Sequence, residues 1–95
     1  MQIAWTKLAD QDIDQIYDYI SEFNPGAAQR IISSIQSSVI HLQTFSEMGR
    51  PGRVHGSREI PVPKTDYTIV YRITGQTVEI LSVIHQFRQW PEDFG

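Results

Sequence analysis

The chain has 95 residues, 40% of them hydrophobic and 20% charged, which is the composition of one globular domain with its own core. It has no cysteine, which excludes disulfides, thiol catalysis and cysteine zinc sites, and it has no apolar run of about 18 residues to span a bilayer. The first residues lack a basic segment followed by an apolar block, so we expect no signal peptide and a cytoplasmic protein.

The net charge of −3 is unevenly distributed along the chain. Residues 1–49 carry two basic and six acidic side chains, whereas residues 50–90 carry six basic and three acidic side chains. A locally basic second half can attract phosphates or an acidic protein segment, and it can equally be an ordinary solvated face.

The first half of the chain predicts a short strand followed by two amphipathic helices. Residues 2–6 favour a strand, and apolar residues then recur every three or four positions in two stripes, as on the buried side of a helix. The first stripe is Ala9, Ile13, Ile16, Ile20 and Phe23, and the second is Ala28, Ile31, Ile35, Val39 and Leu42. The acidic residues of the first helix fall largely off its stripe, so we expect them to form a solvated face.

A helix stop and a helix start lie between the two stripes. Asn24 is a favourable N-cap, and Pro25 suits the first helical position, where its missing N–H costs nothing. Because the link is so short, the two helices are expected to fold back on each other as an antiparallel hairpin.

The second half predicts a loop over residues 45–57 and then three strands. The strands are residues 58–63, 66–73 and 77–85, with Gly75 and Gln76 as a two-residue turn between the last two. The expected fold is therefore α+β in the order β-α-α-β-β-β, one domain over residues 1–95. Its helical hairpin packs on one face of an antiparallel sheet.

Strand alternation predicts which side chains face away from the helices. If Tyr67, Ile69, Tyr71 and Ile73 pack under the helices, Thr68, Val70 and Arg72 point the opposite way. Glu79 is expected to avoid the core, which places it on that open face with Leu81, Val83 and His85. Such a face is too apolar to be left to water, so we expect a partner chain to cover it.

Eight short motifs in a fixed order resemble one protein family. They are Trp5-x3-Ala9-x2-Asp12, Tyr19-Ile20, Asn24-Pro25-x-Ala27-Ala28, Gly49-Arg50, Gly56-x-Arg58-Glu59-Ile60, Tyr67-x-Ile69-x-Tyr71-Arg72, Val83-Ile84-His85 and Arg88-x-Trp90-Pro91. Together they span residues 5–91 and resemble the RelE/ParE superfamily of bacterial toxins, the ParE branch in particular.

The resemblance implies a toxin component of a type II toxin–antitoxin module, such as those that stabilise plasmids. RelE-like members cut mRNA at the ribosome without metal, whereas ParE-like members are thought to inhibit DNA gyrase. It also implies a cognate antitoxin that neutralises the toxin with a flexible C-terminal segment, expected here on the open face. Operator DNA would be contacted only through the antitoxin, and no cofactor, metal or membrane is implied.

The residues favour the gyrase inhibitor over the ribonuclease. Ribonuclease members generally carry an arginine before the penultimate strand's Ile-Val-Tyr, where this chain has Thr68, and Lys64 is the only lysine beyond Lys7. The main hypothesis therefore has no catalytic residues. The alternative, a metal-independent mRNA interferase, would use His85, Arg72, Arg88 and Glu59. A third hypothesis is a degenerate toxin that only binds its antitoxin.

The predicted partner-binding surface consists of the open face and the residues that follow its last strand. It comprises Val70, Arg72, Leu81, Val83, His85, Arg88 and Trp90. Structural roles for some of these residues remain open, because Arg72 can pair with Glu59 or Glu79 across strands and His85 can simply end the sheet.

Overall fold

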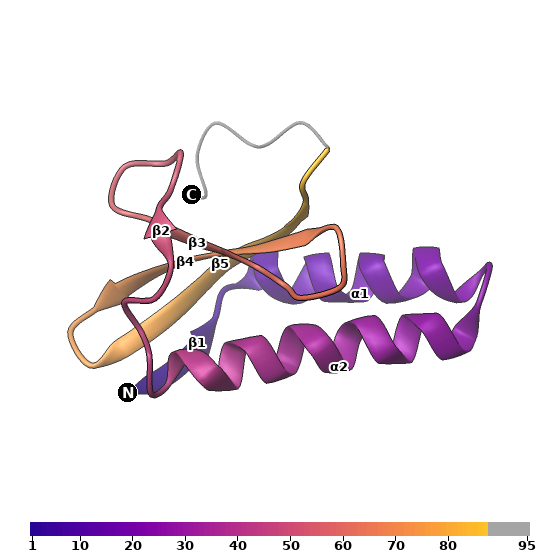
Figure 1. The fold of residues 1–95 in the computed structure, drawn as a ribbon, viewed down its shortest axis with the longest axis horizontal. Coiled ribbons are helices and arrows are strands. Elements are labelled where there is room, and N and C mark those ends of the chain that lie inside the picture. The colour runs from indigo at the N-terminus through magenta and orange to yellow at the C-terminus, as the bar shows by residue number, and fades with distance from the viewer. Residues whose placement is uncertain (88–95) are drawn as a thin grey trace.

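Two helices cover one face of a five-stranded sheet in the computed structural model, which describes residues 1–87 (Figure 1). The elements are β1 (Gln2–Trp5), α1 (Lys7–Ser21), α2 (Pro25–Leu42), β2 (Arg50–Pro51), β3 (Arg58–Pro61), β4 (Tyr67–Thr74) and β5 (Thr77–His85). The predicted fold class and element order are confirmed, with the two-residue β2 added inside the predicted loop. Arg88 and Trp90 lie outside the described residues.

Each helix begins at a side-chain cap, and the cap of α2 is the predicted one. The Asn24 side chain accepts a hydrogen bond from the Ala27 N–H at 3.1 Å, and Pro25 opens α2 as predicted. Thr6 caps α1 in the same way, accepting from the Ala9 N–H at 3.2 Å. Each cap satisfies a backbone donor that the first helical turn would leave without a partner.

The predicted helix stripes form the core, with one exception. Ala9, Ile16, Ile35, Val39 and Leu42 are all buried against the sheet. Phe23, assigned to the first stripe, is instead 74% exposed. Its assignment was wrong because α1 ends at Ser21 and the chain has already begun its turn toward α2. In the described part of the chain no helix is both long and apolar enough to cross a membrane.

The sheet is mixed rather than purely antiparallel. Its strand order is β1-β5-β4-β3-β2, and β1 runs parallel to β5 whereas every other pair is antiparallel. The antiparallel prediction holds where short connections force strands to reverse direction. It fails for β1, because the helical hairpin separates β1 from the other strands and no turn sets its direction.

Asp12 joins α1 to the sheet and does not belong to the predicted solvated face. Its Oδ2 accepts hydrogen bonds from the Ser82 hydroxyl at 2.5 Å and from the Val83 N–H at 3.0 Å. The last register pair between β1 and β5 is Trp5 with Ile80, so β1 does not reach the Val83 amide. The aspartate replaces the missing strand partner, and this contact fixes the start of α1 against β5.

Candidate functional site

A β-bulge in β5 divides the partner-binding surface predicted from the sequence. Val70 of β4 is opposite Ser82, but Tyr71 is opposite Ile80, so Leu81 has no register partner. One extra residue reverses the side to which all later side chains of the strand point. Val83 therefore lies in the core under the helices, and the prediction that Val83 and His85 share the open face with Leu81 is wrong.

The open face carries a small apolar cluster of its own. Val70 and Leu81, both predicted to contact a partner, pack there with Ile84, and their exposed fractions are 0% and 5%. The prediction of their side of the sheet is confirmed. The sequence analysis expects a partner chain to cover this face, and these two side chains are already removed from water in the single chain.

Arg72 lies near the β4–β5 turn and forms an ion pair on the open face. Its Nε is 2.8 Å from Oε1 of Glu79, its register partner, and the Thr74 hydroxyl donates to the same oxygen at 2.9 Å. The hydrogen bonds from Arg72 and Thr74 hold the pKa of the Glu79 carboxyl below its usual value. Of the two partners predicted for Arg72, the structure selects Glu79, and the guanidinium remains exposed.

His85 lies at the end of β5 on the side of the sheet that faces the helices. Its ring packs edge-on against Tyr67 at 5.3 Å between centroids and lies 5.6 Å from the ring of Phe87. Nε2 is 3.9 Å from an Asp66 carboxylate oxygen, and Nδ1 accepts the Phe87 N–H at 3.3 Å. The imidazole is half-buried, so its surroundings are an aromatic strand end with one nearby carboxylate.

The structure separates the catalytic residues of the ribonuclease alternative. Glu59 is opposite Val70 and lies on the open face, only 2% exposed, where it accepts the Arg53 N–H at 2.7 Å and pairs with Arg50 at 3.4 Å. His85 is on the other side of the sheet, opposite Tyr67, which precedes Arg72 by five residues, or roughly 16 Å of strand. His85 therefore lies apart from Glu59 and Arg72, and the three proposed catalytic residues within 1–87 do not form one site.

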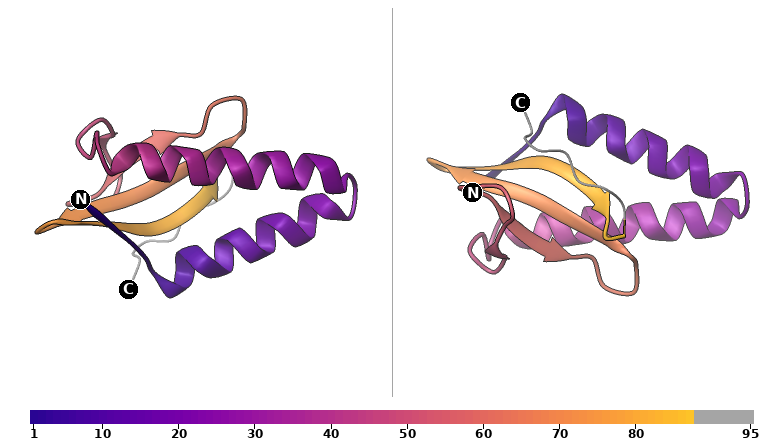
Figure 2. Two further views of the ribbon diagram at one scale, coloured as in Figure 1. Left: turned by 90° about the horizontal axis from the view of Figure 1, so that it is seen from below. Right: turned by 90° about the horizontal axis from the view of Figure 1, so that it is seen from above.

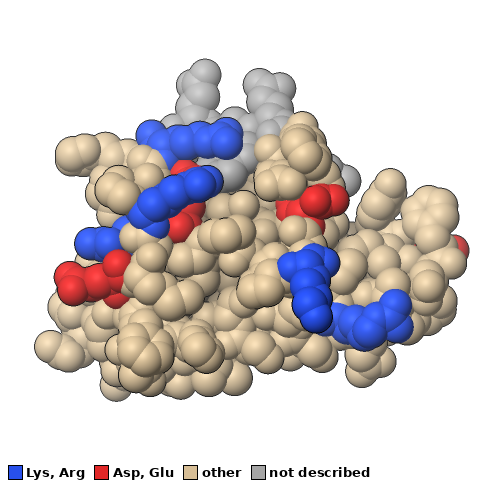
Figure 3. All heavy atoms as spheres, in the orientation of Figure 1, with Lys and Arg blue, Asp and Glu red and all other residues tan. Residues whose placement is uncertain are grey.

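Basic side chains do not merge into one patch on the face seen in Figure 3. Lys and Arg fall into two groups separated by mostly uncharged surface, with acidic side chains beside them. This face gives no continuous anion-binding surface of the kind that nucleic-acid binding requires.

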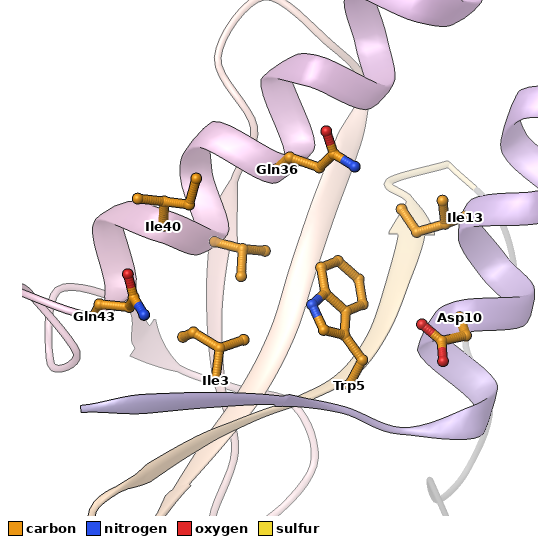
Figure 4. A pocket seen from close by; sticks show the side chains of 8 residues that line it. Ile3, Trp5, Asp10, Ile13, Gln36, Ile40 and Gln43 are labelled. Carbon is orange, nitrogen blue, oxygen red and sulfur yellow. The ribbon is translucent and has the colours of Figure 1, made fainter.

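A hollow lies between β1 and the two helices, away from the predicted surface. It has a volume of about 510 Å³ and is lined by Ile3, Trp5, Asp10, Ile13, Gln36, Val39, Ile40 and Gln43. Figure 4 shows Ile3 and Trp5 pointing from β1 into the space between α1 and α2. We call this hollow the interhelical groove.

The groove continues along α1 toward the helical hairpin. A second hollow of about 430 Å³ is lined by Ile13, Asp14, Tyr17, Asp18 and Ile32, and it shares Ile13 with the first. Both α1 and α2 contribute apolar side chains to this continuation. The acidic side chains along it all belong to α1.

Two features of the sequence indicate the groove, and neither of them belongs to the predicted apolar stripes. Ile40 lies outside the α2 stripe and is 62% exposed, an isolated large apolar residue on the polar side of that helix. Asp10, Asp14 and Asp18 are spaced by four residues, which places them in one row along α1. The direction in which that row faces depends on how the helices pack.

Similarity to known proteins assigns the chain to the RelE/ParE superfamily of toxins. The family model described as ParE toxin of type II toxin-antitoxin system, parDE, matches residues 3–90. The chain therefore belongs to the ParE toxin family, and membership in a toxin–antitoxin family implies an antitoxin partner.

Individual relatives agree with this family. The chain is 40% identical over 91 residues to a Sinorhizobium fredii protein named "Putative toxin Y4kP", covering 96% of this chain and 94% of that one. It is 32% identical over 87 residues to Toxin RelE2 of Caulobacter vibrioides, covering 92% and 97%. A solved structure of the chromosomal ParDE TA system from P. aeruginosa superposes with a TM-score of 0.80 at 30% identity, covering 90% of this chain and 95% of that one.

Proposed function

We propose that this ParE-type toxin inhibits DNA gyrase through protein–protein binding, acts in the cytoplasm and is neutralised by a cognate antitoxin. The observation that carries the proposal is the separation of His85 from Glu59 and Arg72, which supports a binding protein over a ribonuclease. RNA cleavage without metal needs base, acid and phosphate-stabilising groups at one point. Family membership supports the antitoxin, which would also make the contact with operator DNA.

Two of the predicted contact residues keep side chains that a target could reach. Arg72 is exposed near the β4–β5 turn and His85 is half-buried at the opposite end of β5. Val70, Leu81 and Val83 are buried and would contribute by supporting the sheet rather than by direct contact. The proposed gyrase contact therefore includes the exposed Arg72 and the half-buried His85, together with Arg88 and Trp90 of the sequence prediction.

A supercoiling assay tests the proposed target. Purified toxin added to DNA gyrase and relaxed plasmid is expected to block supercoiling, and equimolar antitoxin is expected to restore it. Normal supercoiling at large toxin excess would refute the gyrase proposal. New cuts in bulk mRNA, mapped by primer extension after toxin induction, would favour the interferase instead.

A matched pair of arginine variants tests the contact surface. Arg72→Gln is expected to weaken gyrase inhibition by about tenfold, because interface arginines are often among the residues that dominate binding. Arg30→Gln removes one exposed arginine from α2 and is expected to inhibit like the wild type. Equal inhibition by both variants would exclude Arg72 from the contact.

A further inference from the structure

The loop between β2 and β3, residues 52–57, rises from the sheet on the side opposite the helices (Figure 1). It lies at the sheet edge farthest from β1, and both views of Figure 2 show it at the margin of the molecule. Protruding loops are common sites of binding when a rigid scaffold positions them. The value of this loop as a contact therefore depends on what holds it in place.

A buried carboxylate anchors the loop to the sheet. Glu59 of β3 is only 2% exposed, and its Oε2 accepts the Arg53 N–H at 2.7 Å. Its Oε1 lies 3.4 Å from a guanidinium nitrogen of Arg50, whose side chain is 67% exposed. Burial of a carboxylate is costly unless such partners compensate it. A simple connection between two strands does not require a carboxylate at this position.

The backbone of the loop fits closely around this anchor. The Gly52 N–H donates to the Ser57 carbonyl at 2.8 Å, and the buried Ser57 hydroxyl donates to the Val54 carbonyl at 2.6 Å. A β-carbon at Gly52 would collide with the Ser57 hydroxyl and come within 3.2 Å of the Glu59 carboxylate. Gly56 has a φ of 80°, a conformation that favours glycine. The loop therefore has a defined conformation before any partner arrives.

The side chains that the loop presents to solvent are basic. Residues 50–58 contain three arginines and one histidine and no acidic residue. Arg58 is used within the fold, because it donates to two backbone carbonyls of the preceding loop. Arg50, Arg53 and His55 are exposed. One of the two groups of basic side chains in Figure 3 lies over this end of the molecule.

The loop is continuous with the contact surface proposed above. Arg58 is opposite Tyr71 in the register of β3 and β4, so the loop ends beside Arg72. Glu59 is opposite Val70 and therefore anchors the loop from the open face, the side of the sheet to which Arg72 also belongs. A target that contacts Arg72 would reach the loop without crossing to another side of the molecule.

We propose that the β2–β3 loop is a preformed contact for an acidic surface of DNA gyrase, in which Arg53 binds a carboxylate of the target and Glu59 is a positioning residue. This proposal rests on the proposed gyrase inhibition. A guanidinium group suits a carboxylate because it can donate two parallel hydrogen bonds. Because Glu59 fixes the Arg53 backbone in the free toxin, the loop is already ordered, and the entropic cost of association is lower.

The small size of the basic group favours a protein partner over nucleic acid. Figure 3 shows acidic side chains beside this group and mostly uncharged surface between it and the other basic group. Nucleic-acid binding neutralises several successive phosphates and needs a continuous run of cations. A short acidic patch on a protein can be recognised by one or two arginines in fixed positions.

Binding of the full-length toxin to DNA-free gyrase tests the contact. Arg53→Gln is expected to weaken binding about tenfold at low ionic strength, and the difference from wild type should shrink in high salt. The matched control Arg30→Gln removes an exposed arginine from α2 and should bind like the wild type. Equal affinities of the two variants would refute the contact. Duplex DNA without gyrase is the second probe, and binding there that falls with Arg53→Gln would overturn the protein partner.

Substitutions of the buried carboxylate test its positioning role. Glu59→Gln keeps an oxygen that can accept the Arg53 N–H, so binding should stay within about threefold of wild type. Glu59→Leu removes the acceptor and should weaken binding about tenfold, although Glu59 is too buried to touch the target. The double variant Glu59→Leu/Arg53→Gln should bind no more weakly than Glu59→Leu, because both substitutions remove one contact. Additive losses would show that Glu59 does not act through Arg53.

The outcomes distinguish the loop contact from the gyrase proposal itself. Wild-type toxin that fails to bind gyrase would refute the proposed target, and this inference with it. Wild-type binding with unchanged affinity in Arg53→Gln would refute the loop contact alone. Thermal melting detects a Glu59→Leu protein that does not fold. In that case Arg53→Gln and Glu59→Gln still test the proposal, since the first changes an exposed side chain and the second keeps the size of the buried one.

Discussion

At the scale of single residues, Tyr71 fixes the connection between the helices and the sheet. Its hydroxyl donates to the Ser46 carbonyl at 2.7 Å and accepts the Gly49 N–H at 2.9 Å, although the ring is fully buried. Arg58 donates to the Glu47 and Gly49 carbonyls of the same loop, at 3.0 and 2.9 Å. Strand alternation predicts that Tyr71 belongs to the core, but its loop partners follow only from the folded chain.

Removal of the Tyr71 hydroxyl should destabilise the fold. Tyr71→Phe leaves the Gly49 N–H and the Ser46 carbonyl without this partner, so we expect a loss of about 1–3 kcal/mol in the free energy of unfolding at neutral pH. Tyr17→Phe, at an exposed position on α1, is the control and should change stability by less than about 0.5 kcal/mol. Urea titrations followed by circular dichroism measure both differences.

Comparison of the wild type with Tyr71→Phe also tests the titration of the Tyr71 phenol. Burial raises the pKa of its phenol above the ordinary value of 10.0, while the Gly49 hydrogen bond and the charge of Arg58 oppose that shift. Because the pKa is higher in the folded state, the contribution of Tyr71 is fully present below about pH 10 and is lost as pH rises through the folded pKa. The stability difference between wild type and Tyr71→Phe should stay constant to about pH 10 and then narrow. A constant difference through pH 11 would contradict this assignment.

At the scale of elements, the contact between α1 and β5 depends on one carboxylate and one bulge. Asp12 binds the β5 backbone where β1 has ended, and the unpaired Leu81 lies directly before the bonded Ser82. A regular strand would have placed Val83 and His85 on the open face. The bulge instead directs Val83 into the core and His85 toward α1.

Asp12 and Asp14 provide a matched pair on one helix. Asp12→Ala leaves the Ser82 hydroxyl and the Val83 N–H without their acceptor, so we expect a loss of about 1–3 kcal/mol in unfolding free energy. Asp14→Ala removes an exposed carboxylate with no ion pair among residues 1–87 and should change stability by less than about 0.5 kcal/mol. Equal effects in chemical denaturation would show that the Asp12 contact does not stabilise the fold.

At the scale of the whole molecule, stability should decrease from the centre of the sheet toward its edges. β4 and β5 are central and joined by a long antiparallel register, whereas β2 is an edge strand of two residues. Amides with deeply buried hydrogen bonds exchange only on global unfolding, and edge amides exchange through local opening. The α1–α2 pair covers only one side of this sheet (Figure 1).

Amide hydrogen exchange measures this gradient. We expect the slowest exchange at the β4 and β5 amides near Ile69, Tyr71 and Ile80, and exchange at least about a hundredfold faster around Arg50. Comparable protection in β2 and β4 would contradict a sheet whose stability is concentrated at its centre.

The sequence by itself determined the elements apart from β2, the cap of α2 and most of the core. Local signals suffice for these features, because helix periodicity, the Asn24 cap and the Gly75 turn act between residues close in the chain. The family resemblance was also accessible, since its motifs are short and ordered along residues 5–91.

Only the tertiary structure decided which side chains share a surface. The bulge at Leu81 arises from long-range pairing with β4, and it separates Leu81 from Val83 and His85 in spite of their regular spacing. The direction of β1, the Asp12 contact and the interhelical groove likewise depend on elements far apart in sequence. A one-residue change in strand register moves every later side chain to the other face, and no local pattern in the strand records that change.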